Sequence, residues 1–149
     1  MSDWCQMKQI HASCIAIGEN GVILRGPSAS GKSDLALRLI EEGAELVADD
    51  RVDLVTKDNK LFASPPSGLK GLLEVRGVGI ISLNHLNFVR VNIVIDLVAK
   101  NQLPRMPKFS KINLGGIMVP RVLIFPFEIS ACIKVSIALS EFSKNNCAT

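Results

Sequence analysis

The sequence predicts a single α/β domain in which a mixed, curved β-sheet is covered by few helices. A loop of the form G-x-x-x-x-G-K-[ST] at 26–33 stands between a short apolar run and a helical pattern. The other apolar residues fall mostly in short runs, without the regular strand–helix alternation of a doubly wound sheet. With 149 residues, 48% of them hydrophobic, the chain is long enough to bury one core, and one domain is expected over 1–149.

The first elements predict a hairpin that leads into the loop. Residues 1–9 carry no strong pattern and are expected to form a flexible arm, as are residues 144–149. A strand over 11–17 is expected to turn at Glu19-Asn20-Gly21, because Asn-Gly is a strong hairpin signal. The return strand over 22–25 then enters the glycine-bearing loop.

A helix is expected over 32–42, directly after the loop. Asp34 and Arg38 are an i,i+4 pair for its polar side, and Gly43 is a plausible stop. Its apolar stripe consists of Leu35, Ala36, Leu39 and Ile40.

The rest of the chain predicts strands and one further helix. Apolar and β-branched runs predict strands over 44–48, 52–56, 61–63, 80–83, 91–98 and 119–125. A short helical segment is expected over 69–73 and an exposed, proline-bearing loop over 100–111. Ser130 is expected to cap a final helix. The apolar stripe of that helix includes Cys132, Val135, Leu139 and Phe142.

The loop at 26–33 predicts a nucleotide-phosphate site. Its amides and the helix N-terminus together form an anion cradle. Lys32 can reach the β- and γ-phosphates, and the Ser33 hydroxyl can ligate Mg²⁺. A positive φ at Ala29 would cost about 1 kcal/mol or more. The candidate nucleotide-binding residues are Gly26, Pro27, Ser28, Ala29, Ser30, Gly31, Lys32 and Ser33.

Composition excludes several other classes. A net charge of +3 is too small to indicate nucleic-acid binding. The four cysteines show no paired spacing, which argues against zinc and for reduced thiols. No signal pattern stands at the N-terminus, and no apolar run is long enough to span a bilayer. A soluble, cytoplasmic protein without a membrane partner is expected.

Three acidic positions are candidates for phosphoryl-transfer chemistry. Asp49-Asp50 ends an apolar strand, where site residues gather in α/β sheets. Neighbouring side chains of an extended chain point to opposite faces, so only one of the two should face an acceptor. Asp96 also ends an apolar run and competes as the metal-holding carboxylate. Glu74, beside a glycine-bearing turn, is a second metal-ligand candidate or a surface residue.

Two further features admit two interpretations each. His11 is a structural histidine, or it orients a carboxylate or phosphate. A basic stretch is a solvated loop, or a docking surface for an acidic or phosphorylated partner. Its residues are Lys100, Arg105, Lys108 and Lys111.

Taken in order, these pieces resemble the catalytic domain of HPr kinase/phosphorylase. The resemblance covers roughly 10–140, and its most specific part is the signature-like stretch Leu72–Ile81. It is also carried by His11 and by residues 26–33, 36–40 and 46–50. The chain resembles a short form without the family's separate N-terminal domain.

The resemblance implies a phosphoenolpyruvate carboxykinase-like fold and a serine kinase that uses ATP and Mg²⁺. Its partner would be the phosphocarrier protein HPr, and the protein would be a homo-oligomer, often a hexamer. Asp50 would accept the serine proton with help from His11, and Lys32 would bind phosphate. Ser33 and Glu74 would hold the metal. Asp49, Arg76, Gly77 and Gly79 would support the site, which leaves Asp96 a structural role.

The sequence departs from the family's pattern at Phe125–Ser130. There the family carries an arginine- and glycine-bearing loop associated with dephosphorylation by inorganic phosphate, and this sequence has no arginine. Arg105 and Arg121 do not match the family's catalytic arginine. The alternative function is therefore a nucleotide-sensing regulatory module that transfers no phosphate.

Overall fold

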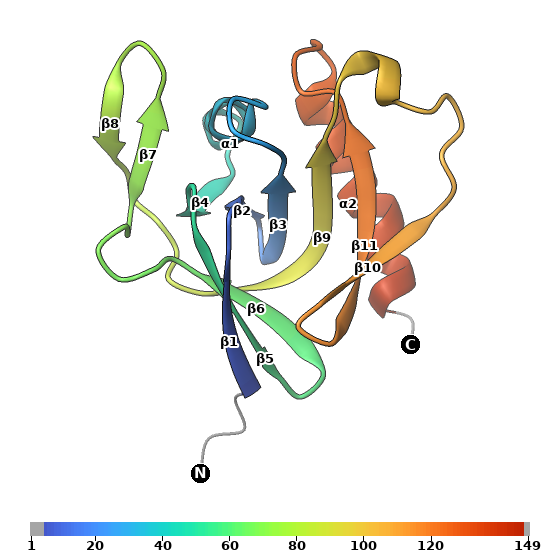
Figure 1. Cartoon of the computed structure of the whole chain (residues 1–149), viewed down its shortest axis with the longest axis horizontal. Coiled ribbons are helices and arrows are strands. Elements are labelled where there is room, and N and C mark those ends of the chain that lie inside the picture. Colours follow the sequence, from blue (N-terminus) through green and yellow to red (C-terminus); the bar gives the residue numbers. More distant parts are fainter. Residues whose placement is uncertain (1–4, 148–149) are drawn as a thin grey trace.

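Strand β9 (Val89–Leu97) is the central strand of the sheet (Figure 1). The computed structural model describes residues 5–147, and the side chains of residues 8–143. It runs parallel to β3 (Asn20–Arg25) and to β11 (Ile117–Ile124). Most of its nine residues are buried, which is why a β-branched run occupies this place.

Nine strands form the main sheet, in the order β1-β5-β6-β9-β3-β2-β4, with β11 beside β9 and β10 beside β11. The other strands are β1 (Cys5–Ile10), β2 (Ser13–Ile17), β4 (Glu45–Ala48), β5 (Val52–Lys57), β6 (Lys60–Ser64) and β10 (Ser110–Leu114). A separate hairpin of β7 (Leu72–Val75) and β8 (Gly79–Ser82) projects beside α1 (Figure 1). The mixed, curved sheet with few helices confirms the predicted fold class.

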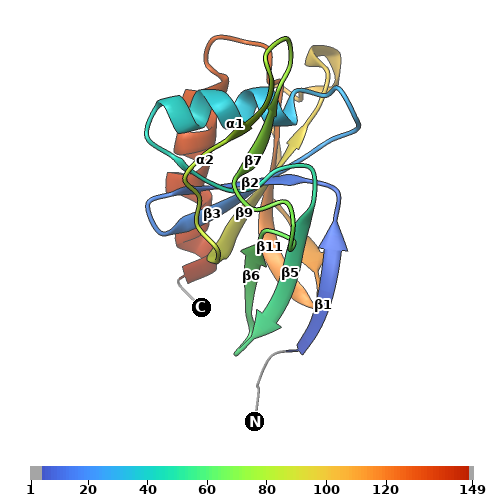
Figure 2. The same ribbon diagram turned by 90° about the vertical axis from the view of Figure 1, so that its left-hand side faces the viewer.

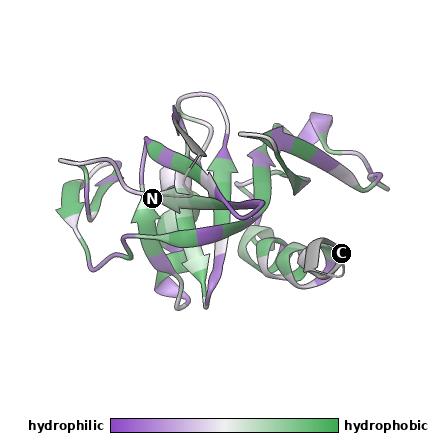
Figure 3. Cartoon of the chain, turned by 90° about the horizontal axis from the view of Figure 1, so that it is seen from below, coloured by the Kyte–Doolittle hydropathy of each residue, from purple (hydrophilic) through white to green (hydrophobic). Residues whose placement is uncertain are grey.

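Helices α1 (Lys32–Glu41) and α2 (Ala131–Cys147) cover the same face of the sheet (Figure 2). A short 3₁₀ helix, η1 (Lys100–Gln102), follows β9. One apolar cluster lies between the two helices and the sheet, and a second lies on the other face, under β5, β6 and β10. Figure 3 shows the hydrophobic central strands and the hydrophilic turns around them. No helix within residues 5–147 is long and apolar enough to cross a membrane.

Two tight turns fix the register of the hairpins that flank the site. Gly18 and Glu19 form the two-residue loop between β2 and β3, with Gly18 at φ 62°, so the predicted hairpin is correct but its turn comes earlier than Asn20-Gly21. Asp58 and Asn59 both adopt positive φ between β5 and β6, as a type I′ turn requires.

Several predicted boundaries are wrong. The expected arm over 1–9 is in part strand β1, which pairs antiparallel with β5; residues 1–4 lie outside the described part. The segment expected to be flexible at 144–149 is helical as far as Cys147, and the last two residues are not described. The short helix expected over 69–73 is a turn followed by β7. Each error concerns tertiary pairing that overrides a weak local preference.

A candidate phosphate-binding site

The loop 26–33 joins β3 to α1 as the sequence predicts. Its first turn is closed by the Ser30 amide, which donates to the Pro27 carbonyl at 3.0 Å. Gly31 adopts the left-handed region, with φ 99°, and its carbonyl accepts the first helical hydrogen bond from Leu35. Ala29 also has a positive φ, 65°, so the strained conformation anticipated there is present. The loop therefore holds a costly backbone shape, with positive φ at both Ala29 and Gly31.

Lys32 is a buried cation that has main-chain partners. Its ammonium donates to the carbonyls of Gly26 and Pro27, at 2.8 and 3.1 Å, and only 8% of the residue is exposed. Burial lowers the pKa of Lys32, while the charges of Asp50 and Asp49 oppose that shift. A buried lysine ammonium favours an anionic ligand, which would replace the two carbonyls as the hydrogen-bond partner of Lys32.

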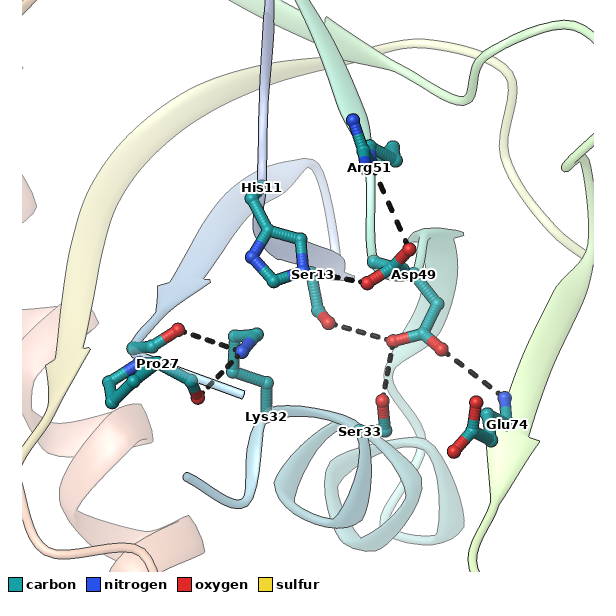
Figure 4. Close-up of polar contacts among 10 residues, drawn as sticks. His11, Ser13, Pro27, Lys32, Ser33, Asp49, Arg51 and Glu74 are labelled. Atoms are coloured by element: carbon teal, nitrogen blue, oxygen red, sulfur yellow. Dashed lines mark hydrogen bonds and ion pairs between the residues drawn. The ribbon is translucent and has the colours of Figure 1, made fainter. Parts of the chain in front are cut away.

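Asp49 connects three elements through one carboxylate (Figure 4). Its Oδ1 accepts the Ser13 hydroxyl of β2 and the Ser33 hydroxyl of α1, both at 2.8 Å. Its Oδ2 accepts the Glu74 amide of β7 at 3.2 Å, and the residue is 7% exposed. The resemblance gave Asp49 only a supporting role, but in the structure it is the carboxylate that contacts Ser33 of the phosphate loop at 26–33 (the P-loop).

Asp50 points away from Asp49 and pairs with His11. The Asp50 carboxylate and the His11 Nε2 lie 2.7 Å apart, and both side chains are substantially exposed. Asp50 has a φ of 70°, and the Arg51 amide donates to the Asp49 carbonyl across it, the bond of a γ-turn. Strained backbone at an exposed acidic residue is a recurrent property of functional sites. One aspartate thus faces the P-loop and the other the solvent, as the alternation of the chain predicts.

The β7–β8 hairpin brings Glu74 beside Ser33, and the main-chain amide of Glu74 donates a hydrogen bond to the Asp49 carboxylate (Figure 4). Arg76 and Gly77 lie in its turn and Gly79 begins β8; Gly77 has φ 86° and Gly79 has φ 124°. A Cβ added at either glycine would meet nothing within 4 Å. The positive φ angles explain the two glycines, because this backbone region favours glycine over residues with a Cβ.

Asp96 lies in a different cluster. Its carboxylate accepts both Nε and Nη2 of Arg25, at 2.8 and 2.9 Å, and also the Arg121 guanidinium. Burial would raise the pKa of Asp96, but the hydrogen bonds and charges of the two arginines outweigh it and hold the pKa below 3.8. Both acceptor oxygens are occupied by arginine, so Asp96 is the structural carboxylate that the resemblance implied, and Arg121 has a structural partner as well.

Sequence reasoning missed Ser13 and Arg51. Ser13 is fully buried and reaches Asp49 only because β2 lies between β3 and β4, which no local pattern reveals. Arg51 places its Nε 3.9 Å from the Asp50 carboxylate. The basic stretch stands apart from the P-loop: Lys108 borders a hollow of about 290 Å³ that includes Phe109 and Arg121 but no residue of 26–33.

The donor set fits a nucleotide that carries its own Mg²⁺. Among the described residues, the Ser30 hydroxyl is buried in the loop without a hydrogen-bond partner, a donor that a phosphate oxygen can use. No group of three or more His, Cys, Asp or Glu side chains within the described residues could hold a metal ion. Mg²⁺ typically binds through one or two protein ligands plus substrate phosphates, and Ser33 with Asp49 supplies that kind of site.

Comparison with known proteins agrees with this geometry. The structure of the Hpr(Ser) kinase/phosphatase from Coxiella burnetii matches with a TM-score of 0.80 at 30% identity, over 95% of this chain and 93% of that one. HPr kinase/phosphorylase from Streptococcus mutans is 35% identical over 127 residues, 77% of this chain and 41% of the relative. The Streptococcus thermophilus protein is 36% identical over 135 residues, 83% and 44% respectively.

The chain therefore spans less than half the length of these curated relatives. The family model described as "HPr Serine kinase C-terminal domain" matches residues 2–122, well over half of the sequence. The chain belongs to the HPr serine kinase C-terminal domain family.

Proposed function

We propose that residues 1–149 form one catalytic domain, a Mg-ATP-dependent kinase that phosphorylates a serine of the phosphocarrier protein HPr. The observation that carries the proposal is the His11–Asp50 pair, 2.7 Å apart, on the solvent side of an anion cradle built by 26–33. Relatives named HPr kinase/phosphorylase support the choice of reaction and of partner.

The residues divide into binding and transfer groups. Lys32 and the amides of 26–33 would hold the triphosphate. Ser33, with Asp49 behind it and Glu74 beside it, would hold Mg²⁺. When bound, ATP supplies the phosphoryl group and Mg²⁺ neutralises its charge.

Asp50 would orient the serine hydroxyl and accept its proton. The serine oxygen forms a bond to the γ-phosphorus as the bond from that phosphorus to the β–γ bridging oxygen breaks, and ADP leaves. A serine hydroxyl is too weak an acid to lose its proton beforehand, so transfer to Asp50 accompanies bond formation. His11 holds the Asp50 carboxylate in place through their hydrogen bond.

The cellular compartment and the oligomeric state are also part of the proposal. In the described residues Cys14 and Cys132 are free thiols, which supports a reducing compartment such as the cytoplasm. Ile129, Ile133 and Ile137 are spaced four residues apart, just before and within α2, and their side chains are exposed. An exposed row of apolar side chains supports a homo-oligomer.

A nucleotide-sensing module without transfer is the second candidate. The absence of arginine from Phe125–Ser130 favours it, since a cationic group usually stabilises the transferred phosphoryl. The placement of Asp50 favours the kinase, because a sensing module has no need of a carboxylate–histidine pair beside the phosphate loop.

Mass spectrometry of HPr after incubation with the protein and Mg-ATP tests the proposal. We expect one added phosphate on a serine. We expect Asp50→Asn to lose the transfer while keeping ATP affinity, and Lys32→Ala to lose both. Tight binding of ATP by the wild-type protein with no phosphoserine formed would favour the sensing module. Full activity of Asp50→Asn would remove the proposed proton acceptor.

A further inference from the structure

The segment between β11 and α2 lies against the P-loop. A Cβ built on Gly31 would come within 3.0 Å of Phe127 Cζ and 3.2 Å of Pro126 Cγ. Arg38, in α1, donates to the Pro126 carbonyl. The segment is therefore fixed both to Gly31 and to the helix that follows the loop, although residues 39–125 of the chain lie between them.

Phe127 is an aromatic side chain held in place while much of it stays exposed. Its ring packs edge-on against Phe125, with centroids 5.9 Å apart and planes at 75°. The neighbouring Pro126 is buried, yet 60% of Phe127 is exposed. An ordered ring that keeps one side in water is a ready stacking surface for a planar ligand.

The position of Phe127 fits one end of a bound nucleotide. Helix α1 begins between the β7–β8 hairpin on one side and the segment leading to α2 on the other (Figure 1). Asp49 and Glu74 contact each other on the side of the β7–β8 hairpin, whereas the Phe127 ring packs against Gly31. Since the proposed transfer end faces Asp50, the nucleoside end extends across the loop toward Phe127.

We propose that the exposed side of the Phe127 ring stacks on the nucleobase of the bound nucleotide. This inference rests on the proposed binding of a nucleoside triphosphate at 26–33, but not on HPr as the acceptor. Stacking on an aromatic ring is tolerant of base identity, because every base presents a π-face. The site should therefore bind ATP and GTP with similar affinity, and both more tightly than inorganic tripolyphosphate.

Calorimetric titration of the full chain with Mg-ATP and with Mg-tripolyphosphate tests the proposal. We expect Phe127→Ala to weaken ATP binding by about tenfold, the low end for loss of one base–aromatic stack, and to leave tripolyphosphate unchanged. Phe127→Trp should retain ATP affinity. Phe127→Leu keeps an apolar side chain on Gly31 without the ring and should show the loss even if the alanine variant misfolds. Met118→Ala, an exposed apolar change in β11, is the control.

The outcomes separate this proposal from the previous one. Equal weakening of ATP and tripolyphosphate by Phe127→Leu would mean that the ring only supports the loop, and unchanged ATP binding would mean that it contacts no base. Either result overturns the stacking proposal and leaves the kinase proposal standing. Failure of the wild-type protein to bind either ligand would overturn both.

Discussion

Ser33 Oγ and Asp49 Oδ1 lie 2.8 Å apart, so that the first turn of α1 is tied to the end of β4. The same oxygen accepts the Ser13 hydroxyl, and this places one buried carboxylate at the junction of the sheet, the helix and the phosphate loop. A hydroxyl–carboxylate pair at this place is what a P-loop enzyme uses to hold Mg²⁺. Under the proposed function, the contact links the stability of the site to Mg²⁺ binding.

Replacing Asp49 should affect both the stability of the fold and the Mg²⁺ dependence of ATP binding. Asp49→Ala leaves the buried Ser13 hydroxyl without its partner, and we expect the free energy of unfolding to fall by about 2 kcal/mol. Urea denaturation measures this. Asp49→Asn retains an acceptor oxygen and should lose less stability, but both variants should lose the Mg²⁺ dependence of ATP binding. Asp34→Ala removes an exposed aspartate and serves as the control; a loss no larger than that of the control would contradict the account.

His11 should affect turnover more than binding. His11→Ala removes the side chain that holds the Asp50 carboxylate, so kcat should fall, by less than the roughly 10²–10⁴-fold expected for loss of the general base in Asp50→Asn. ATP affinity should stay within about twofold, because the His11 ring pairs with Asp50, which lies outside the loop. Steady-state kinetics with HPr, combined with ATP titration, separates the two effects. A large loss of ATP affinity with unchanged kcat would show that His11 belongs to the binding group.

Asp96 should stabilise the fold in a pH-dependent way. Its pKa in the folded protein is held below the usual 3.8, so its ionised form contributes stability that is fully present above the unfolded-state pKa. That contribution is lost as pH falls through the folded-state pKa. We expect Asp96→Asn to cost about 2 kcal/mol at pH 7, between the values for exposed and buried ion pairs. Denaturant titrations from pH 7 downward should show the two proteins converging below about pH 4. A constant difference at all pH values would contradict the assignment.

Ala29→Gly should relieve strain in the P-loop. The alanine has φ 65°, which costs about 1–2 kcal/mol for a residue with a Cβ, whereas glycine loses about 0.5–1 kcal/mol in chain entropy. A net gain of about 0.5 kcal/mol is therefore expected, seen as a small rise in Tm. Ala16→Gly, in buried strand β2, should lower Tm instead. A fall in Tm for Ala29→Gly equal to that control would show that the alanine methyl contributes packing that outweighs its strain.

How far the sequence could predict this site depends on how local each signal is. The strand–loop–helix arrangement around 26–33 and the strands over 52–56 and 61–63 each depend on a few consecutive residues, and the structure confirms these elements. The hydrogen bond between Ser13 and Asp49 depends on strand order, because Ser13 belongs to β2, which lies between β3 and β4. Strand β1 likewise exists by pairing with β5, and its own residues carry little preference for it.

The two aspartates illustrate the same limit. Alternation along an extended chain predicts that Asp49 and Asp50 face apart, and they do. Which of them meets the P-loop serine follows from the γ-turn at Asp50 and from the amide of Glu74, features that the sequence pattern does not contain. The position of Phe127 beside Gly31 could not be predicted either, because residues 32–126 separate the two in the chain.

A crystal structure of the protein with Mg²⁺ and a non-hydrolysable ATP analogue tests the central claim most directly. We predict phosphate oxygens within hydrogen-bonding distance of the amides of 28–33 and of Lys32, the metal on Ser33, and the γ-phosphate on the side of Asp50 and His11. A nucleotide bound elsewhere, or a γ-phosphate directed away from Asp50, would contradict it.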